Sequence, residues 1–431
     1  MFHIVGLFEE DGDEMRRFNF VCIVFLVIIL ANFSLRGDMS LSSVLLSSQS
    51  VTSKISDTEL IIYTYDSLLA DPEYSIETNF AIYAGISPTD ITIIRLSDAN
   101  EILTRLIAEK DLPQADVIIG IDNALIHLIE EKATILEQYT PANISDIDSN
   151  LRQNLDPDGY LIPFDYGIIS LYYQNQIINS STNPELTNLT LKSLLESELL
   201  SMLIVENPMF SSPGLGFLLW TIAIYGDPSI DFSGLMNDDW RNWWKTARES
   251  IVITKSWGEA FDIFFETSEA KPIMISYGTS PAYSYCQWED NSTSAVVTFE
   301  NDQMNAWLQI EGIGLVKNAP HKLMGQKFID WFLGVELQSE IPEHQWMYPA
   351  NIKANVSHCF EQSVINPEDV YRLNNLISPT MLKEHLSNWQ DQWEQVMVKK
   401  TIKGFELPFV FFGILVLFSI RVKRKQKRIN I

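Results

Sequence analysis

Polar side chains follow three strand-like runs of the chain. Residues 65–67 (YDS) come after the first run, Asp98 after the second, and Asp122 and Asn123 after the third. In sheets of parallel strands, ligands bind beyond the carboxyl ends of the strands. Carboxylates gathered there would attract a positively charged solute, although helix capping explains Asp122 equally well.

Residues 211–214 (SSPG) have the composition of an anion-binding site at a helix N-terminus. Two hydroxyls stand just before a helical pattern, and Pro213 fits its first turn. The free backbone N–H groups of such a helix start point outward and bind anions. Ordinary helix capping accounts for the same residues.

Catalytic chemistry has little support. The His residues, at positions 3, 127, 321, 344, 358 and 385, lack metal-ligand spacing. The chain has neither a G-x-S-x-G nucleophile elbow nor the phosphate-binding G-x-x-x-x-G-K-[ST] pattern. We therefore expect a binding protein and not an enzyme, with no metal and no cofactor.

Strands and helices alternate along the chain. Strands are predicted over 59–65, 90–96 and 116–121, and helices over 99–110 and 124–132. This alternation is typical of an α/β fold with a parallel sheet.

A second lobe is predicted after the run 161–173, which Pro163 and Gly167 interrupt. Its elements would be a strand at 202–206, a helix at 217–225, a Trp-rich helix near 239–248 and a return strand at 272–277. We expect lobe 1 over about 59–165 and 277–398, and lobe 2 over about 166–276. Two lobes joined by crossover strands make a hinged clamshell that captures and releases a small solute.

The bulk composition fits such a protein. The 431 residues suit two lobes, and a formal net charge of −26 disfavours nucleic acid as a partner. The simplest explanation of the charge is solubility. Of the three Cys residues, Cys22 lies in an apolar run, whereas Cys286 and Cys359 are compatible with a disulfide and equally with two free thiols.

The N-terminal region carries an apolar run at 18–35, preceded by Arg16 and Arg17. A helix there would be about 27 Å long, close to a bilayer core. We expect a cytoplasmic leader at 1–17, a transmembrane helix or uncleaved signal at 18–36 and a linker at 37–58. The acidic residues before Met15 make Met15 a candidate for the true start.

The C-terminal region has a second apolar run at 407–420, followed by RVKRKQKR. We expect a transmembrane anchor at 405–422 and a basic cytoplasmic tail at 423–431. An amphipathic soluble helix is disfavoured because the run is apolar on all sides. With both ends of the chain in the cytoplasm, the domain at 59–398 would be extracytoplasmic, in a periplasmic or pseudoperiplasmic space.

Seven segments resemble the thiamine-binding periplasmic proteins of ABC importers, in the family's order. They are YTYDS (63–67), ADVIIGIDN (115–123), PFDYG (163–167), SPGLGFLLW (212–220), VITKSWGEAF (252–261), SYGTSPAY (276–283) and IPEHQWMYP (341–349). The resemblance covers about residues 59–398. It implies the type II periplasmic-binding fold, thiamine or its mono- or diphosphate as ligand, and an ABC permease and its ATPase as partners.

The resemblance also implies a site for a flat cationic ring. Its aromatic candidates are Tyr65, Trp257, Tyr277, Tyr283 and Trp346. Each cation–π contact contributes about 0.5–2 kcal/mol when desolvated. Core packing is the simpler explanation for most aromatics, but these five stand beside Gly, Ser or Thr in turn-like segments.

Polar site residues are carried over from the family in the same way. Asp98 falls at the family's ligand-binding carboxylate, followed by Ala99 where the family has Gly. Ser211 and Ser212 would hold the hydroxyethyl or phosphate end of the ligand. Further donors come from one short segment, Gly278, Thr279 and Ser280.

Two alternatives remain beside thiamine capture. The same clamshell could bind another cationic solute, such as a polyamine or a ferric ion coordinated by Tyr65, Tyr277 and Tyr283. It could also be a surface protein without a role in transport. The sequence does not predict which thiamine form is preferred.

Overall fold

The computed structural model describes residues 59–72, 74–266 and 271–398. All described residues belong to one unit of the chain, Ile55–Ile431. The Met15 start, the expected leader, both expected membrane segments, the whole expected linker and the expected basic tail lie outside these ranges. Within them, every helix is too short or too polar to cross a bilayer.

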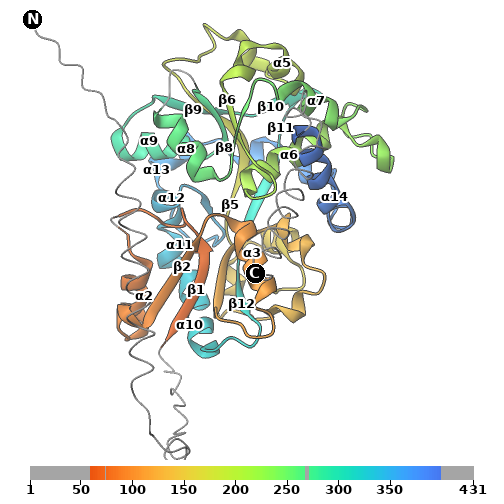
Figure 1. Ribbon diagram of the computed structural model, residues 1–431. Coiled ribbons are helices and arrows are strands. Elements are labelled where there is room, and N and C mark those ends of the chain that lie inside the picture. Colours follow the sequence, from red (N-terminus) through yellow and green to blue (C-terminus); the bar gives the residue numbers. More distant parts are fainter. Residues whose placement is uncertain (1–58, 73, 267–270, 399–431) are drawn as a thin grey trace, which may run out of the picture. The chain divides into compact units, whose positions relative to one another are not determined.

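An 11-stranded sheet runs through the described domain in the order β2-β1-β3-β12-β5-β8-β6-β7, with β4 on β12 and both β9 and β13 on β5 (Figure 1). Its strands are β1 (Leu60–Tyr65), β2 (Ile91–Leu96), β3 (Val117–Asp122), β4 (Leu136–Glu137), β5 (Ile162–Gln174), β6 (Leu203–Glu206), β7 (Val252–Thr254), β8 (Ile273–Tyr277), β9 (Thr293–Val296), β12 (Leu308–Val316) and β13 (Tyr348–Pro349). A smaller sheet contains β10 (Thr298–Glu300), β11 (Gln303–Ala306) and β14 (Tyr371–Arg372).

The expectation of a parallel sheet is correct only for its outer strands. β1 is parallel to β2 and β3, and β6 is parallel to β7 and β8. The two central strands break the pattern, because β12 is antiparallel to β3 and β5, and β5 is antiparallel to β8. The parallel strands β3 and β6 are buried along their whole length, which explains their continuous apolar runs.

β5 connects the two groups of strands. Its first part pairs with β12, up to Ile168 opposite Leu308, and its second part pairs with β8 and β9 from Ile169 onward. The predicted crossover run is thus one strand, and Pro163 does not interrupt it. We call the strands on the β12 side of β5 the first sheet half and those on the β8 side the second sheet half.

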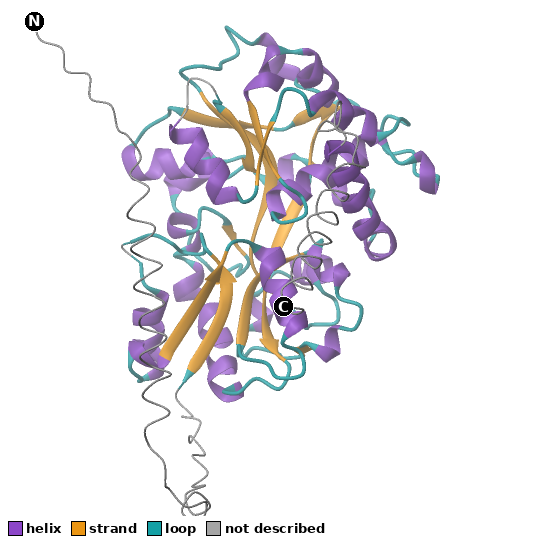
Figure 2. Cartoon of the chain, in the orientation of Figure 1, coloured by secondary structure: helices purple, strands orange, loops and turns teal. Residues whose placement is uncertain are grey.

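Helices flank both sheet halves (Figure 2). They are α2 (Ile76–Ala84), α3 (Ala99–Ala108), α4 (Ser149–Leu155), α5 (Leu191–Glu196), α6 (Ser212–Tyr225), α7 (Trp240–Ala247), α8 (Trp257–Glu266), α9 (Pro281–Trp288), α10 (Lys322–Phe332), α11 (Val335–Gln338), α12 (Ile341–His344), α13 (His358–Ser363) and α14 (Pro379–Val398). α6 is apolar on all sides and buried over nearly its whole length, and it begins five residues earlier than the predicted helix at 217–225.

The predicted helix at 124–132 is wrong. The segment forms two short 3-10 turns, at Leu125–Leu128 and Lys132–Thr134. The Asp122 carboxylate accepts hydrogen bonds from the backbone N–H groups of Ala124 (2.7 Å) and Leu125 (2.8 Å). This side-chain capping stabilises a turn, which competes with a continuous helix.

Cys286 on α9 and Cys359 on α13 form a disulfide with a Cα–Cα distance of 5.5 Å. The bond spans 73 residues, so it restricts a long loop of the unfolded chain. We expect replacement of both cysteines by Ser to lower the Tm by several degrees, measured by circular dichroism. Adding a reductant to the unmodified protein should give the same shift, and an unchanged Tm in both would contradict the prediction.

Candidate ligand-binding site

A cavity of about 560 Å³ lies where the two sheet halves meet. Its lining comes from the end of β1, the turn from β2 into α3, the start of α6, α8, β8, α9, β12 and the segment around the end of α12. Two of the three strand ends that the sequence marked as polar therefore line one cavity, through residues 65–67 and Asp98, whereas Asp122 and Asn123 after β3 do not line it.

Nine of the twelve predicted site residues line this cavity. They are Tyr65, Asp98, Ala99, Ser212, Trp257, Tyr277, Ser280, Tyr283 and Trp346. The other three belong to the layer behind it. Ser211 is the buried residue that precedes α6, Gly278 bonds through its backbone to Ile168, and the buried Thr279 hydroxyl lies 3.7 Å from the Met347 sulfur.

Aromatic rings form one wall of the cavity. Trp257 packs on Phe261 at 4.8 Å between ring centroids, and its indole N–H donates to the Ser276 hydroxyl at 2.9 Å. Tyr283 stands edge-on to Phe261 (5.6 Å) and to Trp346 (5.6 Å). Because the indole bond fixes the orientation of Trp257, the wall presents a rigid ring face to a ligand.

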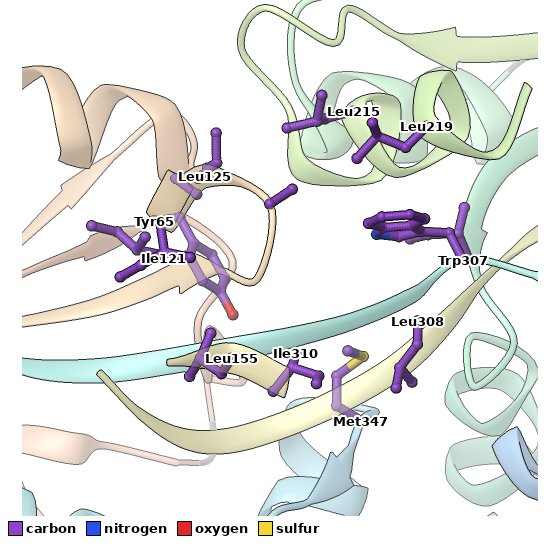
Figure 3. Close-up of a cluster of buried hydrophobic side chains, with 14 of the residues drawn as sticks. Tyr65, Ile121, Leu125, Leu155, Leu215, Leu219, Trp307, Leu308, Ile310 and Met347 are labelled. Carbon is purple, nitrogen blue, oxygen red and sulfur yellow. The ribbon is translucent and has the colours of Figure 1, made fainter. Parts of the chain in front are cut away.

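Tyr65 lies on the floor of the cavity, beside the buried side chains of β3 and β12 (Figure 3). Its hydroxyl donates to Glu311 Oε2 at 2.6 Å and accepts from Gln345 Nε2 at 2.8 Å. The ring packs on Gly120, whose φ is +111° and where a Cβ atom would come within 2.4 Å of the ring. Glycine is required there both by the backbone conformation and by the ring.

Glu311 projects from β12 into the cavity and anchors a buried network. Gln309 donates from Nε2 to Glu311 Oε1 (2.7 Å) and to the Tyr277 hydroxyl (2.8 Å). Burial, together with the neighbouring carboxylates of Asp122 and Asp98, raises the pKa of Glu311 to about 8, although the hydrogen bonds from Tyr65 and Gln309 lower it. The same burial raises the pKa of Tyr65 and Tyr277 well above the usual range.

Asp165 on β5 lies directly opposite Glu311 in the strand register. It is fully buried, and neither carboxyl oxygen has a hydrogen-bond partner within the described part of the chain. Burial and the charge of Glu311 raise the pKa of Asp165 well above its usual range. A buried acid pair without a cation is costly unless it holds a proton or a positively charged partner.

Two further carboxylates hold the start of α6. Asp98 Oδ1 accepts from the Ala99 N–H at 2.7 Å and from the Ser212 N–H at 3.3 Å, and the Ser212 hydroxyl donates to Asp122. Burial raises the pKa of Asp98 to about 7 although these backbone bonds lower it. The structure thus connects Asp98 and Ser212, which lie 114 residues apart in the sequence.

Glu311 was absent from the predicted site, and one signal could have indicated it. It is the single charged residue in the apolar strand LQIEGIGLV, whose other side chains are buried in the core. A lone acid in such a strand has to be paired or functional. Phe261 and Trp288 also line the cavity, but nothing local separates them from the other aromatic residues of the chain.

The lining is suited to an organic cation. Among the described residues, the lining contains aromatic faces and carboxyl groups but neither lysine nor arginine, and its one histidine, His344, is hydrogen-bonded to Asp71 at 2.7 Å. Among the described residues, no three His, Cys, Asp or Glu side chains are grouped so that they could hold a metal ion. A flat positively charged ring would find stacking partners and opposite charge here.

Comparisons with known proteins agree on the kind of protein. A family model described as bacterial extracellular solute-binding protein matches residues 88–362. The chain is 29% identical to the thiamine-binding periplasmic protein of Escherichia coli K12, over 68% of this chain and 81% of the relative. It is 26% identical to the protein of that name from Brucella melitensis, over 78% of this chain and 91% of the relative.

A solved structure has the same architecture. A periplasmic thiamin-binding protein superposes with a TM-score of 0.65 at 25% identity, covering 78% of this chain and 96% of the solved one. The described domain therefore has the α/β periplasmic-binding-protein fold. Given this match and the extent of the family model, the chain belongs to the family of bacterial extracellular solute-binding proteins.

Proposed function

We propose that the chain captures thiamine or a thiamine phosphate outside the cytoplasm and delivers it to an ABC permease and its ATPase. The observation that carries this proposal is the cavity, with aromatic walls, a carboxyl-rich floor and no lysine or arginine among the lining residues that the structure describes. Thiamine has a cationic thiazolium ring and a flat aminopyrimidine, which match those two features. The names of the relatives from Escherichia coli and Brucella point to the same ligand.

In this proposal the two sheet halves act as the lobes of a type II clamshell. The predicted boundaries apply except that the second lobe would also include β9, which pairs with the second part of β5 beyond residue 276. β5 runs through both halves and is the natural hinge element, because a strand shared by two bodies can bend where its pairing partners change. The apolar runs at 18–35 and 407–420 would tether the domain to the outer side of the cell membrane.

Isothermal titration calorimetry on the purified full-length chain in a mild detergent tests the proposal. The ligands are thiamine, its mono- and diphosphate, spermidine and ferric citrate. We expect at least one thiamine form to bind with a Kd below about 1 µM, equivalent to about 8 kcal/mol. Tighter binding of spermidine or ferric ion than of every thiamine form would contradict it and favour another solute.

A further inference from the structure

Trp288 stands at the mouth of the cavity, at the end of α9. It lines the cavity, yet it is 59% exposed. Its ring lies edge-on to Tyr283, with 5.0 Å between the ring centroids, and Tyr283 in turn lies edge-on to Trp346. Trp288 therefore extends the aromatic wall outward to the solvent. An indole in this position can stack on a flat ring or lie over a cation.

The two ends of α9 are held very differently. At the start of the helix, Pro281, Ala282 and Ser284 are buried. At the other end, residues 287–291 are all exposed, and Glu289 ends the helix in the left-handed conformation with a φ of +52°. A helix of eight residues is not stable on its own. The orientation of Trp288 therefore depends on what fixes the last turn of α9.

The disulfide attaches this last turn to α13 (Figure 1). Cys286 and Trp288 are two positions apart, so their side chains leave α9 about 200° apart, on nearly opposite sides. The bond to Cys359 thus holds the side of the helix that faces away from Trp288. α13 is itself anchored, because the buried Phe360 packs edge-on against Tyr348 at 5.1 Å between ring centroids, and Tyr348 belongs to β13, which pairs with β5.

The other links between the two segments are weaker or lie elsewhere. The Tyr285 hydroxyl donates to Gln362 Oε1 at 3.4 Å, which is a long hydrogen bond at an exposed position. The Ile365 N–H donates to the Gly278 carbonyl at 2.9 Å, but Gly278 precedes α9. Among the described residues, the disulfide is therefore the main restraint on the last turn of α9.

Resting on the proposed function, we infer that Trp288 contacts a ring of bound thiamine at the cavity mouth, and that the Cys286–Cys359 disulfide positions Trp288 for this contact. The disulfide then contributes to affinity through Trp288, in addition to its effect on stability. Tyr283 depends on it much less, because rings on both sides, those of Phe261 and Trp346, already hold the Tyr283 ring at 5.6 Å.

Calorimetry with thiamine on four full-length chains in a mild detergent tests the inference. The chains are the unmodified one, Trp288→Ala, the double variant Cys286→Ser with Cys359→Ser, and all three changes together. We expect Trp288→Ala to weaken binding about tenfold and the double variant to weaken it about fourfold. If the disulfide acts through Trp288, the combined variant should lose about tenfold, whereas independent effects would multiply to about 40-fold.

Tyr83→Ala is the matched control, because Tyr83 on α2 is an aromatic residue that is 51% exposed and does not line the cavity. It should bind thiamine like the unmodified chain. Trp288→Phe keeps a ring and should recover most of the loss caused by Trp288→Ala. If the cysteine variants fold poorly by circular dichroism, the same comparison is made on the unmodified and Trp288→Ala chains with and without a reductant.

Each outcome bears on a separate part of the inference. An unchanged affinity of Trp288→Ala would overturn the contact with the ligand. An unchanged affinity after loss of the disulfide, or a combined loss of about 40-fold, would overturn the positioning role. If no thiamine form binds to the unmodified chain, the proposed function itself is wrong.

Discussion

Replacing Glu311 with Gln is expected to weaken thiamine binding about 30-fold at about pH 8.5, equivalent to about 2 kcal/mol. Gln keeps the size of the side chain and an oxygen that can accept from Tyr65, but it removes the negative charge that faces the cavity. A buried charge opposite a cationic ligand contributes more than an exposed one because water does not screen it. Titration calorimetry of both proteins gives the ratio of their Kd values.

The pH dependence separates this charge effect from a loss of packing. The pKa of Glu311 is raised to about 8, so the Glu311 carboxyl is protonated below that pH when the cavity is empty. A bound cation favours the ionised carboxylate instead. Thiamine affinity of the unmodified chain should therefore rise between about pH 6.5 and about pH 8.5, with release of a proton. Glu311→Gln should flatten this rise, and an equally steep rise would contradict the assignment.

The raised pKa of Glu311 also makes the free energy of unfolding depend on pH, in the opposite direction to thiamine affinity. An unfolded Glu loses its proton near pH 4.3, so between about pH 4 and about pH 8 the folded chain binds more protons than the unfolded chain. The contribution of Glu311 to the free energy of unfolding therefore falls as the pH rises through this window.

Glu300→Gln serves as the control for the binding experiments on Glu311, because Glu300 is a buried acid with a raised pKa outside the cavity lining. That variant should bind thiamine with the affinity of the unmodified chain, and this affinity should have the same pH dependence.

Trp257→Ala is expected to weaken thiamine binding by more than about tenfold, or about 1.4 kcal/mol. The indole ring lines the cavity, packs on Phe261 and is oriented by its bond to Ser276, so its loss removes a fixed stacking face. Phe265→Ala on the same helix is the control, because Phe265 is 41% exposed and does not line the cavity. Equal affinities of the Trp257 variant and the unmodified chain would leave Trp257 with a packing role alone.

Local patterns predicted the first three strands and the cavity position of two of their three polar ends. The runs at 59–65, 90–96 and 116–121 became β1, β2 and β3 with shifts of one residue or so, because Ile, Val and Tyr in continuous apolar runs specify buried strands. Tyr65 and Asp98 line the cavity because they stand at or just after the carboxyl ends of β1 and β2.

What the sequence missed depends on contacts between distant segments. The antiparallel insertion of β12 between β3 and β5 joins residues 140 or more positions apart, and no local pattern encodes it. The turn after β3 replaced a helix because of one carboxylate, Asp122, which also binds Ser212 on α6. The hydrogen bonds of Asp98 and Asp122 with Ser212 at the start of α6 are contacts of the same long-range kind. The sequence therefore indicated an anion-binding helix start at 211–214 without showing that carboxylates already bond to it.

A crystal structure of the full-length chain with thiamine tests the central claim most directly. The thiazolium ring should lie within the cavity of about 560 Å³, against Trp257 or its aromatic neighbours and within reach of the Glu311 carboxylate. Thiamine bound at another surface with this cavity empty, or no bound thiamine at saturating concentration, would contradict it.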